Sequence, residues 1–273
     1  MGLRVNTNLA SLNAQRSLSA VSNRLMGNFK RLSSGLRIAT AADDAAGLGI
    51  SERMRSQIRS YGAAARNAQD GISLVQTAEG ALNEVNSILN RMRELSIQAA
   101  NGTLSTADRA TLDTEYQELI NEISRIASTA TFNGVELLDG STTALDIQAG
   151  INQQEIITVS LQDATATALS INALDVTTAA NATSALSVLD AAVDSVTTAR
   201  GALGSAQNRL QSAISSISNA QENLAAAESR IRDVDVATET ADLTRNTIMQ
   251  QAAVAVLSQA NVQPQLALSL LQG

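Results

Sequence analysis

The stretch RLSSGLRIATAADDAAGLGI, residues 31–50, holds the residue types that a phosphate-binding or metal-binding loop would use. The spacing of these residues fits neither a phosphate-binding loop nor a metal-binding loop. A P-loop needs GxxxxGK[ST], and Gly35 is followed by Leu-Arg-Ile; a dinucleotide fingerprint needs GxGxxG after a strand, and Gly47-Leu-Gly follows a helical pattern. Adjacent carboxylates on a helix, such as Asp43 and Asp44, point about 100° apart and do not converge on one ion. We expect both to lie near the start of the next helix, where the helix dipole favours acids.

The amino-acid composition removes most catalytic chemistry. The chain has no His, no Cys and no Trp, and Lys30 is its only lysine. A Ser-His-Asp triad needs His, a thiol enzyme needs Cys, and zinc sites use mainly His and Cys as ligands. We therefore expect no enzyme, no catalytic residue, no cofactor and no metal site. Hydrophobic residues make up 44% of the chain but aromatic residues only 1%, which favours long, closely packed helices over an aromatic-lined ligand pocket.

Charge is unevenly distributed along the chain. Residues 1–42 carry +6 with no acid, so the net charge of −7 leaves −13 on the other 231 residues. The basic residues are spread at helical intervals without interleaved aromatics, so we expect an acidic partner helix and no nucleic acid. The C-terminal candidates for that helix are Asp233, Asp235, Glu239 and Asp242. No apolar stretch is long enough to predict membrane insertion, and the N-terminal residues lack the apolar segment of a secretory signal.

The first half of the sequence predicts three helices. Residues 8–36 carry apolar side chains spaced three and four apart, at Leu18, Val21, Leu25, Phe29, Leu32 and Leu36. Residues 50–100 carry a heptad row that includes Val75, Leu82 and Leu89, and Asn101-Gly102 ends this helix. Ser105 to Asp108 resembles a capping box that opens the third helix.

The pattern changes at Asn133-Gly134. Residues 145–149 and 155–161 alternate apolar and polar side chains between turn-forming residues, so we predict small antiparallel β-hairpins over about 132–162. Residues 163–184 are rich in Thr, Ala and Ser, and we expect a loop or a weakly structured insert.

The last third predicts long helices again. Seven apolar residues stand seven apart in one register, at Leu189, Val196, Leu203, Leu210, Ile217, Leu224 and Ile231. A final stripe contains Ile248, Ala252, Val256 and Leu266. The predicted fold is therefore mainly α: a long antiparallel coiled-coil-like bundle with small β-hairpins and paired N- and C-terminal helices. Its terminal stripes need partners, because a lone helix cannot bury them.

Six sequence blocks, in order, resemble the bacterial flagellins, the subunits of the flagellar filament. The N-terminal blocks are RVNTNLASLNAQRSL (4–18) and RLSSGLRI…ADDAAGLGI (31–50), followed by RMRELSIQAANGT (91–103) and TFNGVELLDG (131–140). The C-terminal blocks are AESRIRDVDVATETADL (227–243) and QQAAVAVLSQANVQPQLALSLL (250–271). Because the hairpin block runs almost directly into the C-terminal heptads, the chain resembles a minimal form without extra outer domains.

The resemblance implies a self-assembling structural subunit with two layers. Residues 1–43 and 231–273 would form the inner, core-lining domain of the filament, and residues 44–230 an outer rod with the hairpins. It implies an extracellular location in the filament, reached without a cleaved secretory signal. The expected partners are further copies of the chain, the flagellar export apparatus, an export chaperone, and the cap and hook-junction proteins.

The resemblance also implies recognition by a host Toll-like receptor, with Arg91, Leu95 and Glu115 as contacts. Two alternative functions remain open at the level of the sequence. One is a hook–filament junction protein with flagellin-like ends. The other is a flagellin-like cell-surface module that binds polysaccharide, although the scarcity of aromatic residues argues against it.

Overall fold

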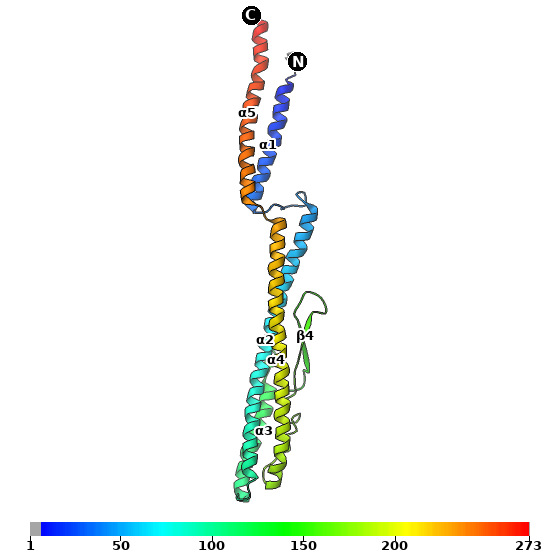
Figure 1. The fold of residues 1–273 in the computed structure, drawn as a ribbon, viewed down its shortest axis with the longest axis vertical. Helices are drawn as coiled ribbons and strands as arrows, with labels where there is room; N and C mark the ends of the chain where they lie inside the picture. Colours follow the sequence, from blue (N-terminus) through cyan, green and yellow to red (C-terminus); the bar gives the residue numbers. More distant parts are fainter. Residues whose placement is uncertain (1–6, 273) are drawn as a thin grey trace. The chain divides into compact units, whose positions relative to one another are not determined.

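The computed structural model describes residues 7–272, and side chains up to residue 262. The protein is mainly helical, as predicted (Figure 1). The elements in chain order are α1 (Leu9–Ser34), α2 (Ala45–Ala99), α3 (Thr106–Thr129), β1 (Thr131–Phe132), β2 (Val135–Glu136), β3 (Ala144–Gln148), β4 (Ile156–Ser160), α4 (Ala179–Arg232) and α5 (Val236–Gln272). Among the described residues, none of the helices combines the length and the hydropathy that a membrane span requires.

The chain divides into two compact units, each formed by segments that are distant in sequence. Residues 1–56 and 223–273 form the terminal unit, and residues 57–222 form the central unit. The long helices α2 and α4 each contribute one part to either unit.

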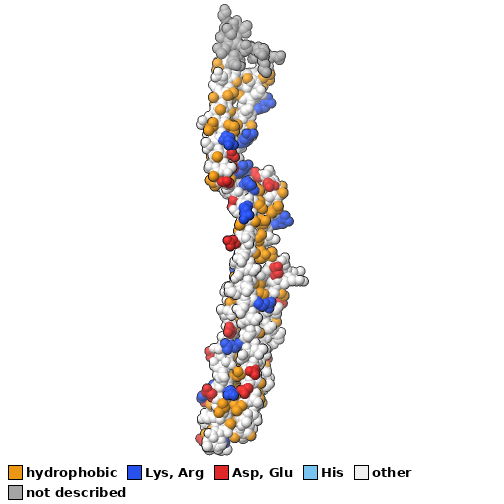
Figure 2. Space-filling model, in the orientation of Figure 1, with side chains coloured by type: hydrophobic (Ala, Val, Ile, Leu, Met, Phe, Trp, Pro, Cys, Tyr) orange, Lys and Arg blue, Asp and Glu red, His pale blue; other side chains and the backbone are white. Residues whose placement is uncertain are grey.

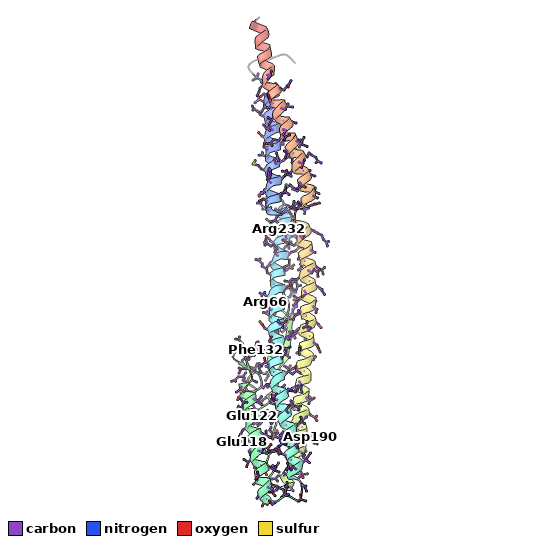
Figure 3. The ribbon with its side chains drawn as sticks, turned by 90° about the vertical axis from the view of Figure 1, so that its left-hand side faces the viewer. Arg66, Glu118, Glu122, Phe132, Asp190 and Arg232 are labelled. Carbon is purple, nitrogen blue, oxygen red and sulfur yellow. The ribbon has the colours of Figure 1, made fainter. Side chains whose placement is uncertain are left out.

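The central unit is an antiparallel helical bundle. Arg93 of α2 pairs with Asp190 of α4, whereas Arg200 of α4 pairs with Glu79 of α2, so residue numbers rise along one helix as they fall along the other (Figure 3). The heptad positions within the central unit are almost fully buried, among them Val75, Leu82 and Leu89 of α2 and Leu189, Leu203 and Leu210 of α4. Leu224 and Ile231, at the end of the predicted row, are half-buried. The predicted heptad rows thus meet within one chain.

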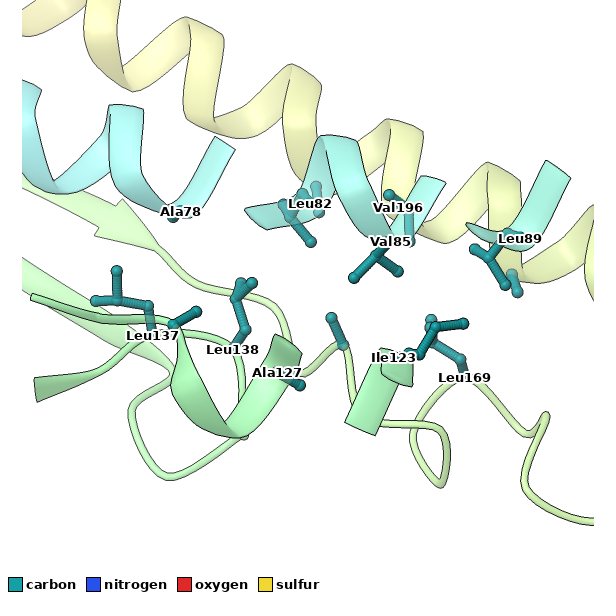
Figure 4. Packing of buried hydrophobic residues seen from close by; sticks show 14 of the residues in the cluster. Ala78, Leu82, Val85, Leu89, Ile123, Ala127, Leu137, Leu138, Leu169 and Val196 are labelled. Atoms are coloured by element: carbon teal, nitrogen blue, oxygen red, sulfur yellow. The ribbon is translucent and has the colours of Figure 1, made fainter. Parts of the chain in front are cut away.

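The third helix and the residues after it close this core. Ile123 and Ala127 of α3, with Leu137, Leu138 and Leu169 beyond it, face the apolar side of α2 (Figure 4). The predicted capping box opens α3: Ser105 Oγ accepts from the Asp108 backbone N–H at 3.2 Å, and the Asp108 carboxylate accepts from the Ser105 backbone N–H at 3.1 Å. This reciprocal pairing satisfies two of the free donors at the helix end.

Two antiparallel hairpins follow α3 where the sequence predicts them. β1 pairs with β2 through Asn133 and Gly134, whose φ angles of 50° and 79° suit the tight turn between two-residue strands. β3 pairs with β4, and the inward side chains Ile157 and Val159 of β4 are 8% and 0% exposed.

Of the loop or weakly structured insert expected at 163–184, the structure has the loop, at residues 163–178. Residues 163–178 are a loop without regular strands or long helices, but Ala164, Ala166, Leu169, Ile171 and Val176 are all buried in the central core. The loop is also fastened to α3, where Asp113 accepts from the Val176 backbone N–H at 2.9 Å and Gln117 donates to the Leu174 carbonyl at 3.0 Å. Its small side chains allow the backbone to lie close to the helices, and α4 begins already at Ala179.

The terminal unit is built around α1 and α5, which lie side by side and run in opposite directions (Figure 1). Asn8 donates to the Ala260 carbonyl near one end of the pair, and Leu36 pairs with Asp233 at the other. This confirms the predicted pairing of the N- and C-terminal helices.

Candidate functional site

The loop of residues 35–44 connects α1 to α2, and its two carboxylates accept hydrogen bonds from different groups. Gly35 ends α1 with a left-handed φ of 71°. Asp43 accepts from the backbone N–H groups of Ala39 and Thr40 and from the Thr40 hydroxyl, and the backbone bond to Thr40 is the main cause of its lowered pKa. Asp44 instead caps α2, accepting from the N–H groups of Ala46 and Gly47 at 3.0 Å each. The two carboxylates therefore do not converge on an ion.

Arg37 fastens the same loop to the end of α4. Its backbone N–H donates to the Arg232 carbonyl at 2.6 Å, and its guanidinium donates to the Ile231 carbonyl at 2.6 Å. The N–H of Val234 donates back to the Gly35 carbonyl at 3.0 Å. A cation at the last carbonyls of a helix also interacts favourably with the helix dipole. The motif that resembled a phosphate loop thus ties the α1–α2 connection to the α4–α5 connection.

The glycines of this motif permit a matched test. A Cβ at position 47 would overlap the Asp44 carboxylate and lie 2.8 Å from Ile38 Cδ1, whereas a Cβ at position 49 meets nothing within 4 Å. We expect Gly47→Ala to destabilise the start of α2 by about 1–3 kcal/mol, because it displaces a capping side chain and crowds a buried one. Gly49→Ala should instead stabilise the helix by about 0.5–1 kcal/mol. Hydrogen exchange of the amides of the first turns of α2 measures both, and equal effects would contradict this assignment.

The two apolar stripes predicted in the N- and C-terminal helices differ in how far their side chains are buried. In α1, Val21 and Leu25 are buried, Leu18 and Leu32 are half-buried, and Phe29 is 59% exposed. Leu36, just beyond the end of the helix, is half-buried. Val21 and Leu25 are therefore covered within the chain, and the use of this row in contacts between subunits stays a prediction. The stripe is wider than the contact with one helix, so Phe29, at its edge, remains open to solvent.

The C-terminal stripe faces solvent. Ile248 and Val256 are 61% and 59% exposed, and Ala252 is exposed as well. The side chain of Leu266 lies outside the residues that the structure describes. Hydrophobic side chains are visible on the surface of this helix pair in Figure 2. The side of α5 that meets α1 instead carries Glu239, Asn246 and Ala260 as its buried residues.

Asn28, Glu239 and Asn246 are joined by hydrogen bonds; sequence reasoning missed the two asparagines and named Glu239 only as a charged partner of the basic arm. These polar residues are 6%, 7% and 8% exposed between α1 and α5. The available signal was the spacing of seven between Glu239 and Asn246, which places both on one face of a helix.

Of the four expected acidic partners of the basic arm, Glu239 has an ion pair with α1 within the described residues, to Arg31 at 3.5 Å. Asp242 pairs with Arg245 of its own helix, and Asp235 caps its own helix.

The comparisons with known proteins agree over almost the whole chain. The profile of the bacterial flagellin N-terminal helical region matches residues 5–143, and that of the C-terminal helical region matches residues 186–271. A flagellin of Halalkalibacterium halodurans is 49% identical, over 98% of this chain and 99% of its own. The chain belongs to the bacterial flagellin family. It is thus a structural subunit of the helical flagellar filament, which lies outside the cell and serves swimming motility.

Two further relatives support this assignment. The flagellar filament 30.7 kDa core protein of Treponema maltophilum is 42% identical over 98% of this chain and 99% of its own, so the short form is shared. The crystal structure of Bacillus cereus flagellin matches with a TM-score of 0.52 and 34% identity, covering 60% of this chain and 94% of that one. Neither relative favours the alternatives of a junction protein or a polysaccharide-binding module.

The three residues that the flagellin resemblance assigns to receptor recognition occupy different environments. Arg91 of α2 and Glu115 of α3 are 49% and 46% exposed and form an ion pair at 2.9 Å. Hydrogen bonds to Glu115, and then to Glu94, raise the pKa of Arg91. Leu95, in contrast, is 1% exposed in the central core. A side chain buried in this way does not reach a partner, so its predicted role as a contact does not fit the folded subunit.

Proposed function

We propose that residues 1–43 and 231–273 form the inner layer of the filament and residues 44–230 the outer rod, with the terminal helices supplying the assembly energy. The distribution of exposed large hydrophobic side chains supports this. Among the described residues there are twelve, and nine of them fall in the two terminal segments: Leu9, Leu12, Met26, Phe29, Val236, Ile248, Val254, Val256 and Val262. The other three are Ile50, Ile97 and Ile156.

Exposed apolar side chains gathered on one part of a chain are typical of an interaction surface. Copies that join through unlike surfaces in a contact that does not close form an open helical polymer. Surface ion pairs contribute little by comparison. We therefore assign filament contacts to Phe29, Ile248, Ala252 and Val256, and retain Val21 and Leu25 as the intrachain part of the terminal pair.

A growth assay tests the assembly function and separates the alternatives. Purified chain added to short filament fragments should extend them into long tubes visible by electron microscopy, with a rate that rises with chain concentration. A junction protein would instead stop at the fragment ends. A polysaccharide-binding module would not extend the fragments, and would be retained on a polysaccharide resin.

Export and addition to the filament require further partners. We propose that the chain passes through the flagellar export apparatus with a chaperone and without a cleaved secretory signal. It then joins a filament bounded by cap and hook-junction proteins. Membership of the flagellin family supports these partners.

We also propose that the Arg91–Glu115 surface contributes to recognition of the free subunit by a Toll-like receptor. The two exposed side chains come from neighbouring helices and hold each other in place, which supports a preformed contact. Leu95 is buried in the central core and does not belong to this surface.

Arg91→Ala should raise the half-maximal concentration of monomer in a receptor reporter assay about tenfold or more, as expected when an anchoring Arg is lost from an interface. Arg125→Ala is the matched control, because Arg125 of α3 is also exposed and also pairs with a Glu, Glu122, at 2.6 Å. Equal potency of Arg91→Ala and the unchanged chain would contradict the proposal.

A further inference from the structure

The connection between α2 and α3 contains one of the two Asn-Gly pairs of the chain. Asn101 and Gly102 follow the end of α2, both are exposed, and a Cβ at position 102 would meet nothing within 4 Å. The other pair, Asn133-Gly134, forms the turn between β1 and β2. In such a pair the backbone nitrogen of Gly is a potential nucleophile towards the side-chain amide of the preceding Asn, because Gly has no Cβ to hinder the approach.

The hydrogen bonds at Asn101 fall on the two oxygens that gain negative charge in this reaction. Arg109 Nη2 donates to the Asn101 backbone carbonyl at 2.8 Å, and the backbone N–H of Leu104 donates to the same oxygen at 3.3 Å. The backbone N–H of Thr103 donates to Asn101 Oδ1 at 3.2 Å. Arg109 is itself held in place, since its Nε donates to the Ala99 carbonyl at 2.9 Å.

The backbone oxygen belongs to the same peptide group as the attacking nitrogen. When Gly102 N–H loses its proton, the negative charge is shared between that nitrogen and the Asn101 carbonyl oxygen. A guanidinium that donates to this oxygen binds the anion more strongly than the neutral peptide, because the hydrogen bond is then charged on both sides. Arg109 is therefore placed to activate the nucleophile by stabilising its deprotonated form.

The side-chain oxygen receives the charge in the next step. Attack on Asn101 Cγ moves negative charge onto Oδ1, and the Thr103 N–H already donates to this atom. A backbone N–H in this position stabilises a tetrahedral intermediate in the way that an oxyanion hole does. The same hydrogen bond closes a small ring that contains both Asn101 Cγ and Gly102 N, so the reacting atoms are held near each other.

We propose that Asn101-Gly102 is a site of spontaneous modification, at which the fold itself promotes loss of the Asn101 side-chain amide. Gly102 N forms a bond to Asn101 Cγ, the bond from Cγ to Nδ2 breaks, and Nδ2 leaves as ammonia with the proton from Gly102. Water then opens the cyclic imide at either carbonyl carbon, which gives an aspartate or an isoaspartate at position 101.

Both products alter the connection between α2 and α3. The new carboxylate lies just after the C-terminal end of α2, where the helix dipole disfavours a negative charge. Isoaspartate also adds a methylene to the main chain between two helices whose side chains are packed together. We therefore expect modified chains to hold α3 less firmly against α2.

The Asn133-Gly134 pair provides an internal control. Asn133 has a φ of 50°, and the two residues are fixed between the paired strands β1 and β2. Formation of the imide turns the Gly nitrogen towards the Asn side chain, which here requires the β1–β2 pairing to break. The same fold should thus promote the reaction at Asn101 and suppress it at Asn133.

Mass spectrometry of the incubated full chain measures both sites, with synthetic peptides of residues 97–105 and 129–137 as references. Asn101 should lose its amide about threefold or more faster in the chain than in its peptide, which is a modest effect for a charge-assisted hydrogen bond at an exposed site. Asn133 should react more slowly in the chain than in its peptide. A rate at Asn101 equal to or below that of its peptide would overturn the proposal.

Substitution of Arg109 tests the assigned cause. Arg109→Ala should slow the reaction at Asn101 about threefold or more, and leave Asn133 unchanged. Arg125→Ala is the matched control, because Arg125 is also on α3 but pairs with Glu122, and it should change neither site. An unchanged or faster reaction at Asn101 in Arg109→Ala would overturn the role of Arg109.

A second variant covers loss of structure. If Arg109→Ala also speeds the reaction at Asn133 to the rate of its peptide, the hairpin has opened, and Arg109→Lys decides instead. Lys keeps a cation at the Asn101 carbonyl, so Asn101 should still react faster than its peptide. A rate in Arg109→Lys that is no faster than that of the peptide would overturn the role of the cation.

Discussion

Deletion of residues 1–43 and 231–273 should give a soluble, helical monomer that does not polymerise, even on filament fragments of the full chain. The buried core of the central unit runs from Ala68 to Leu210 and lies entirely within the part that remains. The deletion removes nine of the twelve exposed large hydrophobic side chains among the described residues. Circular dichroism and size-exclusion chromatography measure the folded monomer, and electron microscopy measures growth.

Either of two results would contradict this expectation. Filaments that grow from the trimmed chain would show that the central unit supplies the assembly contacts. A trimmed chain that loses its helical signal would show that the central bundle depends on the terminal helices for stability.

The double substitution Ile248→Glu with Val256→Glu should abolish filament growth and leave the monomer almost unchanged. Both side chains are about 60% exposed in the monomer, at 61% and 59%, so charging them breaks few contacts within the chain. In a filament that buries them, each loses roughly 1.5–3 kcal/mol of apolar burial. The two together should raise the lowest concentration that supports growth about 100-fold or more.

Ile97→Glu provides the matched control. Ile97 of α2 is 52% exposed but lies in the central unit, so the same chemical change there should leave growth on filament fragments near normal. If Ile97→Glu and the double substitution impair growth equally, exposed apolar residues matter wherever they stand, and the terminal helices have no special role.

Sequence periodicity was sufficient for the long elements. The heptad rows through Val75 and Leu189 predicted the antiparallel bundle, because a row of apolar residues on one helix face has to be covered and the two rows lie in the same chain. The Ser105 cap and the Asn133-Gly134 turn were predictable because their hydrogen bonds and φ angles depend on residues that are close in sequence. The six sequence blocks, which occur in the same order as in the flagellins, likewise indicated the family.

The candidate site was only partly predictable. The sequence excluded a phosphate or metal loop at 35–49, since the spacing alone was wrong. It did not reveal that Arg37 holds the end of α4, because the carbonyl acceptors at Arg230 and Ile231 are almost 200 positions away in sequence. The family block suggests a surface contact at Leu95, whereas packing of the helices places this side chain inside the core.

The sequence by itself determined which segments are helical, that the two ends form helices that pair, and that both ends carry more apolar surface than one helix can bury. The tertiary structure decided how that surface is divided. Val21 and Leu25 turn inward, while Phe29, Ile248 and Val256 turn outward. The physical reason is that hydrophobic pattern is local and non-directional, whereas the hydrogen bonds of Asn28 to Glu239 and Asn246 are directional and join residues more than 200 positions apart.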